Sequence, residues 1–129
     1  MNVVTFDYDS TYIPAAPFVQ IEIDGYMGNK SRKNLWATVD SGADASMIPQ
    51  SILQEVGATY KETNWMSGTA GGRVEVDLYL VAIQLGSELI HGLHVVSIPS
   101  LSEAVIGRDV LNQLIVTLNG LAGIDRSVH

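Results

Sequence analysis

Short runs of alternating apolar and polar residues, separated by turn-forming residues, limit this chain to a fold built mainly of β-strands. The clearest run starts at Phe18, where three aliphatic residues alternate with polar side chains as in a half-buried strand. Two of the connections, Gly86-Ser87 and Asn119-Gly120, predict hairpin turns of two residues. Further strand-like runs cover residues 35–40, 59–66, 73–85, 88–98, 104–106, 115–118 and 121–124.

Two segments favour short helices. Residues 49–56 begin with a proline and are followed by Gly57, which suit the start and the end of a helix. Residues 108–113 form the second predicted helix. The polar segment 25–34 holds three of the seven basic residues and predicts a solvated loop. The sequence therefore predicts an all-β domain with one or two short helices.

Composition excludes several classes of function. The chain has 129 residues, no cysteine, and a net charge of −7 from seven basic and fourteen acidic side chains. Without a basic stripe, binding to nucleic acid or to anionic membrane lipid is disfavoured. Without cysteine, disulfides and thiolate metal sites are excluded. The first residues lack the basic segment of a secretory signal, and no apolar run is long enough to span a membrane, so we expect a cytoplasmic protein.

The segment V-D-S-G-A-D at 39–44 carries the most informative chemistry. An apolar strand delivers Asp40 into a turn made by Ser41 and Gly42. Backbone N–H groups and a hydroxyl in such a turn hold a carboxylate in one pose and favour its ionised form. Gly42 lets another backbone approach closely because it has no side chain. On this pattern alone, an ordinary turn remains the alternative interpretation.

Two further segments alter the balance between these interpretations. The glycine-rich W-M-S-G-T-A-G-G-R-V at 65–74 joins two strand-like runs, and A-V-I-G-R-D-V-L at 104–111 leads into N-Q-L-I-V-T-L-N-G at 112–120. In order and spacing over residues 18–120, the sequence resembles the retropepsin-like aspartic proteases. The resemblance implies a closed, mostly antiparallel acid-protease barrel over 18–129, preceded by an extended N-terminal arm over 1–17.

The resemblance also implies roles for individual residues. Asp40 matches the catalytic aspartate, and the hydroxyl of Ser41 would brace two active-site loops across a dimer. Asp44 and Arg108 match a charge pair that ties this loop to the last helix. The remaining positions match the active-site loop, with Gly42 and Ala43, and the flap that closes over a peptide, with Met66, Ser67, Gly68, Thr69, Ala70, Gly71 and Gly72.

The chemistry requires two carboxylates about 3 Å apart that share one proton. The chain carries the Asp-Ser-Gly segment once, so the second Asp40 must come from a second copy, and we expect a homodimer. An extended peptide or protein substrate would then be hydrolysed by water, with activity favoured at acidic to mildly acidic pH. Apolar subsites are suggested for the substrate side chains at Ile48, Val81, Ile83 and Ile106.

Other interpretations were weighed on the same residues. A non-catalytic peptide-binding or dimerisation module, and a monomeric scaffold, remain alternatives on this fold. The glycine-rich 67–72 segment lacks the Gly-Lys-Ser/Thr ending of a phosphate-binding loop. The serines at 41, 46 and 51 lack a convincing His/Asp arrangement for a hydrolase. His91 and His94 alone do not make a metal site, so no metal or cofactor is expected.

Overall fold

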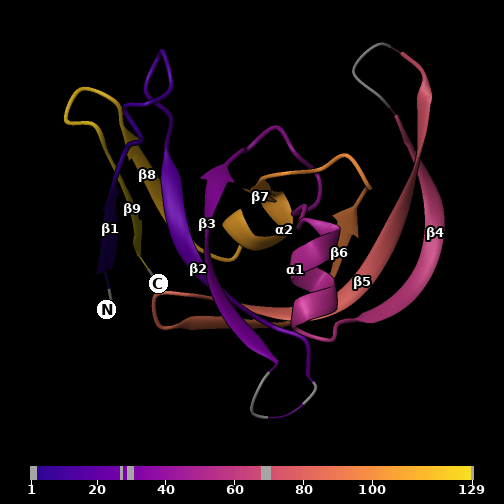
Figure 1. The fold of residues 1–129 in the computed structure, drawn as a ribbon. Coiled ribbons are helices and arrows are strands. Elements are labelled where there is room, and N and C mark those ends of the chain that lie inside the picture. The colour runs from indigo at the N-terminus through magenta and orange to yellow at the C-terminus, as the bar shows by residue number, and fades with distance from the viewer. Residues whose placement is uncertain (1–2, 27, 29–30, 68–70, 129) are drawn as a thin grey trace.

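The computed structural model describes residues 3–26, 28, 31–67 and 71–128. Strands dominate these residues, which confirms the predicted all-β class. The strands are β1 Val3–Asp7, β2 Phe18–Asp24, β3 Arg32–Val39, β4 Thr59–Ser67, β5 Arg73–Leu85, β6 Glu88–Ser97, β7 Ala104–Ile106, β8 Ile115–Asn119 and β9 Ile124–Val128, with helices α1 Gln50–Glu55 and α2 Arg108–Leu111 (Figure 1). Neither of these described helices is long and apolar enough to cross a membrane.

Six strands form one strongly curved sheet in the order β4-β5-β2-β3-β7, with β6 paired to β5. Only β3 and β7 run parallel among the described pairs of this sheet. Between β6 and β7 the described contacts are single bridges from Met47 to Val96 and to Val105, so no continuous ladder links those strands. The sheet is therefore a half-barrel, and the predicted closed barrel is wrong.

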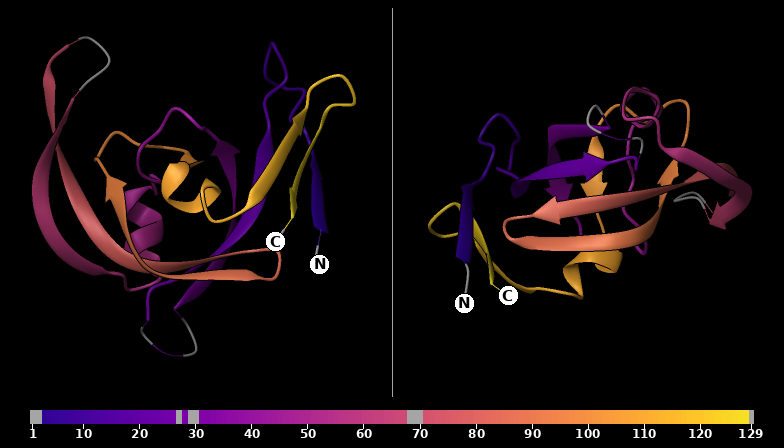
Figure 2. Two further views of the ribbon diagram at one scale, coloured as in Figure 1. Left: turned by 180° about the vertical axis from the view of Figure 1, so that it is seen from behind. Right: turned by 90° about the horizontal axis from the view of Figure 1, so that it is seen from below.

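A separate sheet of three strands, in the order β1-β9-β8, brings the two ends of the chain together. Val3 lies opposite Val128 in its register, and the two termini lie side by side in each view of Figure 2. Strand β1 thus occupies part of the predicted N-terminal arm, whose boundary at residue 17 stays a prediction. The hairpin at Gly86-Ser87 is confirmed, because Leu85 pairs with Glu88.

The predicted two-residue turn at Asn119-Gly120 is wrong. Asn119 is the last residue of β8 and pairs with Ile124, so the turn spans residues 120–123. The side-chain oxygen of Asn119 accepts a hydrogen bond from the Ala122 N–H at 3.0 Å. This side-chain bond stabilises a wider turn than the Asn-Gly pair alone indicates.

The predicted loop over 25–34 is shorter than expected, because β3 begins at Arg32. Asp24 lies opposite Arg32 in the β2–β3 register, and the carboxylate of Asp24 lies 3.3 Å from Nε of Arg32. Opposite charges on neighbouring strands stabilise the pairing, so polar residues extend the strand here. The next residue, Lys33, forms an ion pair with Glu55 at 2.6 Å, which ties β3 to α1.

Both helices lie on the concave side of the half-barrel (Figures 1 and 2). Helix α1 follows Pro49 and ends where the N–H groups of Gly57 and Ala58 bond to the carbonyls of Gln54 and Leu53. Gly57 adopts a φ of 67°, the left-handed conformation that such a helix end requires. The side chains that fill the space between helices and sheet are fully buried and aliphatic: Ile21, Ile23, Ile48, Leu53, Val81, Ile83, Ile106 and Val110.

One ionisable group is buried in the three-stranded sheet. Asp125 of β9 lies between Phe6 and Leu118 on the neighbouring strands and is only 2% exposed. Its Oδ1 atom has no hydrogen-bond partner among the described residues. Burial raises the pKa of Asp125 to about 6. Because the ionised form is disfavoured in the folded chain, the folded state loses stability as the pH rises from below 4 through about 6.

Replacing Asp125 by Asn is expected to remove this pH-dependent loss. The rise of the pKa from 3.8 to about 6 corresponds to at most about 3 kcal/mol of unfolding free energy at neutral pH. Urea unfolding of Asp125→Asn and wild type at one protein concentration, from about pH 4 to pH 8, measures the difference. The variant should be the more stable protein at high pH only. Asp7→Asn, which removes an exposed carboxylate of β1, is the control, and an unchanged pH profile for Asp125→Asn would contradict the assignment.

Candidate active site

Asp40 directly follows β3, at the point where β3 meets β7. Val39 pairs in parallel with Ile106, and the backbone N–H of Asp40 donates to the carbonyl of Ile106 at 2.9 Å. Val39 and Ile106 are both buried, whereas Asp40 is exposed. The pairing thus places the backbone firmly and presents the carboxylate to solvent.

The turn after Asp40 holds its side chain. The N–H of Gly42 donates to Oδ1 of Asp40 at 2.8 Å, and the N–H of Ala43 donates to the Asp40 carbonyl at 3.2 Å. One carboxylate oxygen is therefore fixed by the backbone, while the side chain remains accessible. This is the arrangement that the Asp-Ser-Gly segment predicts.

The structure brings Arg108, the first residue of α2, against this loop. One guanidinium nitrogen donates to the Ser41 carbonyl at 2.9 Å, and the other pairs with the Asp44 carboxylate. The side chains of Arg108 and Asp44 are 43% and 79% exposed. Because solvent screens such a pair, it contributes less than about 1 kcal/mol to stability.

Two partly buried hydrogen bonds between Ser46 and Asp109 link the same two segments. Asp109 accepts hydrogen bonds from the Ser46 backbone at 2.9 Å and from the Ser46 hydroxyl at 2.7 Å. The Ser46 hydroxyl in turn accepts the Gly107 N–H at 3.0 Å, and Ser46 is 0% exposed. These bonds are not predicted by the sequence pattern, although Asp109 directly follows Gly107 and Arg108.

Gly107 is required by the closeness of the two backbones. A Cβ atom at this position would lie 2.8 Å from the Ala43 carbonyl oxygen and 2.8 Å from the carbonyl carbon of Ala45. Side chains are not accommodated against backbone at such distances. The Gly107–Arg108 segment therefore supports the Asp40 loop through direct backbone contact. This contact includes a hydrogen bond from the Arg108 N–H to the Ala43 carbonyl at 2.9 Å.

The predicted flap is the hairpin of β4 and β5, which stands out from the half-barrel on the side opposite the three-stranded sheet (Figure 1). Met66 is half-buried, while Ser67, Gly71 and Gly72 are exposed. The flap positions Gly68, Thr69 and Ala70 lie outside the described residues. Met66 pairs with Val74 in the register of the hairpin. Side chains two residues apart on a strand point to the same face, so Met66 and Val74 share a face with the buried Val76.

The suggested apolar subsites are wrong. Ile48, Val81, Ile83 and Ile106 are each 0% exposed and belong to the core between the sheet and the helices. Their apolar character reflects packing, which the sequence pattern cannot distinguish from a substrate pocket.

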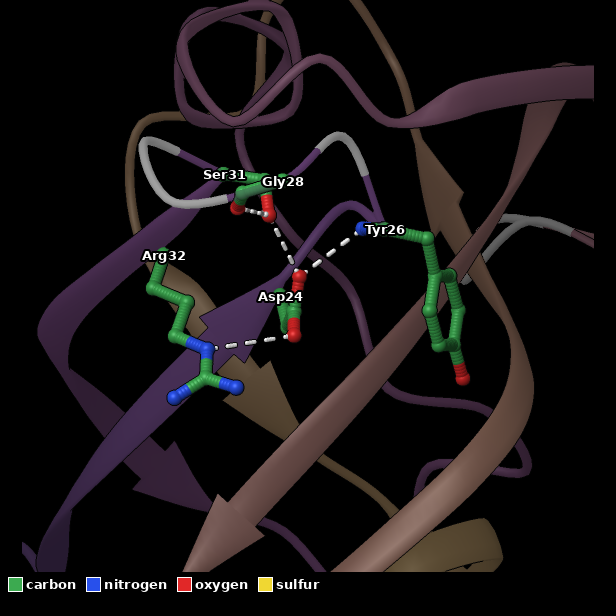
Figure 3. Close-up of a pocket in the computed structure, with 5 residues that line it drawn as sticks. All are labelled: Asp24, Tyr26, Gly28, Ser31 and Arg32. Atoms are coloured by element: carbon green, nitrogen blue, oxygen red, sulfur yellow. Dashed lines mark hydrogen bonds and ion pairs between the residues drawn. The ribbon is translucent and has the colours of Figure 1, made fainter.

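A hollow of about 350 Å³ lies at the β2–β3 loop (Figure 3). Its lining residues all belong to this loop and to the adjoining ends of the two strands. One oxygen of Asp24 accepts hydrogen bonds from the Ser31 hydroxyl at 2.7 Å and the Tyr26 N–H at 2.8 Å. The bonds from Ser31 and Tyr26 lower the pKa of Asp24. The β2–β3 loop and Asp40 lie at opposite ends of β3, so about 25 Å of strand separates the hollow from Asp40.

The described residues contain no cluster of three or more His, Asp or Glu side chains that could hold a metal ion. His91 instead stacks on Tyr26, with ring centroids 6.3 Å apart. The Tyr26 hydroxyl lies 3.4 Å from Nδ1 of His91 and accepts the N–H of Gly92 at 3.0 Å. These contacts give His91 a packing role beside the β2–β3 loop.

Comparisons with known proteins agree with this geometry. A family model described as aspartyl protease matches residues 19–110, which include the Asp40 loop, the β4–β5 hairpin and the Gly107–Arg108 segment. The crystal structure of a retropepsin-like aspartic protease from Rickettsia conorii superposes with a TM-score of 0.70. That match has 11% sequence identity and covers 98% of this chain and 89% of the other, so it concerns the fold alone. No curated protein matches the chain.

Removing the Ser46–Asp109 hydrogen bonds is expected to lower the free energy of unfolding more than removing the exposed Asp44–Arg108 ion pair. Asp109→Ala leaves the buried Ser46 hydroxyl and N–H without their charged acceptor, so the free energy of unfolding should fall by about 2–4 kcal/mol. Asp44→Ala should lower it by less than about 1 kcal/mol. Chemical denaturation of both variants at one protein concentration tests this order, and a larger loss for Asp44→Ala would contradict it.

Proposed function

Because the chain belongs to the aspartyl protease family and has a retropepsin-like fold, we propose that it is an aspartic endopeptidase that acts as a homodimer. Its substrates would be peptides or proteins, and two Asp40 residues, one from each subunit, would form the catalytic pair. The observation that carries the proposal is the exposed Asp40 carboxylate, held by the Gly42 N–H on a loop that Arg108 and Asp109 support.

The need for a second subunit follows from the number of carboxylates. The mechanism uses two carboxyl groups about 3 Å apart that share one proton. Within the Asp40 loop the other carboxylate, Asp44, is paired with Arg108 and belongs to the support of the loop. A second copy of Asp40, related by a two-fold axis, supplies the missing group.

The three-stranded sheet is the surface on which we propose that the subunits meet. Strand β8 pairs only with β9 among the described residues, so its other edge presents unpaired backbone groups. Ile115 and Leu118 of this strand are 64% and 49% exposed. An apolar strand with a free edge is a template for pairing with another chain.

In the proposed reaction, the ionised Asp40 takes a proton from a water molecule lying between the two carboxyl groups. The water oxygen attacks the carbonyl carbon of the peptide bond, and the protonated Asp40 of the second subunit gives its proton to the carbonyl oxygen. When the resulting tetrahedral species collapses, one of its hydroxyl groups returns a proton to the second Asp40, the C–N bond breaks, and the leaving nitrogen takes the proton held by the first Asp40. The products are a carboxylic acid and an amine, and no covalent enzyme intermediate forms.

Other residues of the chain position these groups. The Gly42 N–H fixes one oxygen of Asp40, and the hydroxyl of Ser41 would brace the paired loops across the axis. The β4–β5 hairpin would close over an extended peptide and exclude bulk water, which strengthens the electrostatic interactions inside the site. A non-catalytic peptide-binding or dimerisation module would use the same surfaces without turnover.

Replacing Asp40 by Asn is expected to abolish peptide cleavage while preserving the fold and the dimer, because the exposed side chain is not part of the core. Digestion of a peptide library at several pH values, followed by mass spectrometry, measures the activity. Circular dichroism and sedimentation check the fold and the subunit number. Glu88→Gln, at the β5–β6 turn, is the control and should retain activity. Equal cleavage by Asp40→Asn and wild type would refute the proposal, whereas peptide binding without cleavage by either would favour the binding module.

Mixing the two proteins tests whether subunits share one site. If wild type and Asp40→Asn exchange subunits in equal amounts, about half of the wild-type chains remain in fully wild-type dimers, so activity should fall to about one half. In the control, an equal amount of an unrelated protein is added in place of Asp40→Asn. Chemically inactivated Glu88→Gln is not suitable for this purpose. Activity that stays constant while sedimentation shows mixed dimers would mean that each subunit works alone.

A further inference from the structure

A groove lies beside β3 and outside the Asp40 loop, between the N-terminal segment and the start of α1. It consists of two hollows of about 300 and 310 Å³ that share Asp9, Phe18 and Trp36. We define this Trp36 groove by its acidic and aromatic lining residues: Asp7, Asp9, Tyr12, Phe18, Trp36 and Glu103. No residue of it is assigned to the catalytic loop or the flap.

Aromatic rings form the floor of the groove. Trp36 is 54% exposed, because it points outward from β3 while Ala37 and Val39 point into the core. The Trp36 ring is held edge-on against Phe6 at 5.7 Å, and the Tyr12 ring lies 5.3 Å from that of Phe18. The tryptophan is thus fixed in place by another ring and yet presents a large apolar surface to solvent.

Carboxylates form the rim, and no basic residue lines the groove within the described part of the chain. Oδ1 of Asp9 accepts the N–H and hydroxyl of Thr11, and Oε1 of Glu103 accepts the Tyr12 hydroxyl at 2.6 Å. These bonds orient the carboxylates and use one oxygen of each, so the second oxygen is left for a ligand.

Four basic side chains are engaged elsewhere, and two others, Lys61 and Arg126, line neither hollow. Arg32 pairs with Asp24, Lys33 with Glu55 and Arg108 with Asp44. The guanidinium of Arg73 lies over the ring of Trp65 on the β4–β5 hairpin. The groove therefore keeps its negative charge, and its chemistry complements a positively charged ligand.

The backbone beside the groove favours an extended ligand. Strand β3 pairs with β7 only through Ala37, Thr38 and Val39, so Leu35 and Trp36 lie beyond the last pair on that edge. A strand edge that is not covered along its length accepts extended peptide, and the exposed indole face attracts a lysine or arginine side chain.

We propose that the Trp36 groove binds an extended segment of another protein that carries lysine or arginine side chains. Such a segment would place its cationic groups against Asp7, Asp9 and Glu103 and over the Trp36 ring. Trp36 lies four residues before Asp40, about 13 Å along the strand, so a bound segment would sit next to the active-site loop but outside it. The binding does not depend on whether Asp40 is catalytic.

The test uses Asp40→Asn protein, so that cleavage cannot remove the ligand. Fluorescence anisotropy would compare a labelled ten-residue peptide of alternating lysine and glycine with the same peptide carrying glutamine for lysine. The lysine peptide should bind at least about tenfold more tightly, and its affinity should fall as salt is added.

Variants locate the binding surface. Trp36→Ala, and the double variant Asp9→Asn with Glu103→Gln, should each weaken the lysine peptide about tenfold or more, whereas Trp36→Phe should keep part of the affinity. The double variant Glu88→Gln with Leu89→Ala, at the β5–β6 turn, removes one carboxylate and one exposed apolar side chain elsewhere and should bind normally. Thermal unfolding checks that each variant is folded.

Three results would overturn the proposal. The first is equal binding of the lysine and glutamine peptides, and the second is unchanged affinity in both groove variants. The third is a shift of the subunit equilibrium by Trp36→Ala without loss of peptide binding, which would make the groove a contact between copies of this chain. A protein that binds the lysine peptide but cleaves nothing as wild type would contradict only the proposed protease function.

Discussion

The close approach of the β7–α2 segment to the Asp40 loop is the constraint on which the rest of the site depends. Gly107 allows two backbones to pack at a distance that no side chain tolerates, and the partly buried Ser46–Asp109 bonds hold them there. The exposed Arg108–Asp44 ion pair helps to orient the loop but contributes little to the free energy of unfolding. The exposed Asp40 carboxylate is thereby positioned by backbone and side-chain contacts that are buried or partly buried.

The half-barrel agrees with the proposal that two subunits share one site. Strand β3 carries Asp40 at one end, the β4–β5 hairpin projects at one side, and the three-stranded sheet lies at the other. The core behind them is mostly aliphatic and includes Leu53 of α1 and Val110 of α2, so both helices pack against the sheet. Under the proposed function, one two-fold operation would supply both a second carboxylate and a partner for β8.

Much of the fold could be predicted from the sequence because strand alternation and glycine turns are local signals. The β5–β6 hairpin and the start and end of α1 follow from such signals. The extent of β3 could not be predicted, since Arg32 joins the strand only through its contact with Asp24 across the sheet. Closure of the barrel could not be predicted either, because it depends on whether β6 and β7 pair. In the described part of the chain, Met47 alone bridges them.

The candidate site shows the same division. Asp40 and its turn are encoded in consecutive residues, and their geometry matches the prediction. Ser46 and Asp109 are separated by 63 positions, so neither has a local pattern that announces the bond between them. The four isoleucine and valine side chains suggested as subsites lie in the core, because hydrophobicity alone does not tell a pocket wall from packing.

The pairing of Val3 with Val128 has a consequence for protein engineering. Opposed residues of antiparallel strands have Cα atoms about 5 Å apart, so a linker of a few glycines would join the first strand to the last without strain. New ends could then be opened at the exposed Gly86-Ser87 turn. Such a circular permutant would move both termini from the strand ends to this turn. Because Gly86 lines one hollow together with Val4 and Phe6, a domain fused there would still lie beside the three-stranded sheet.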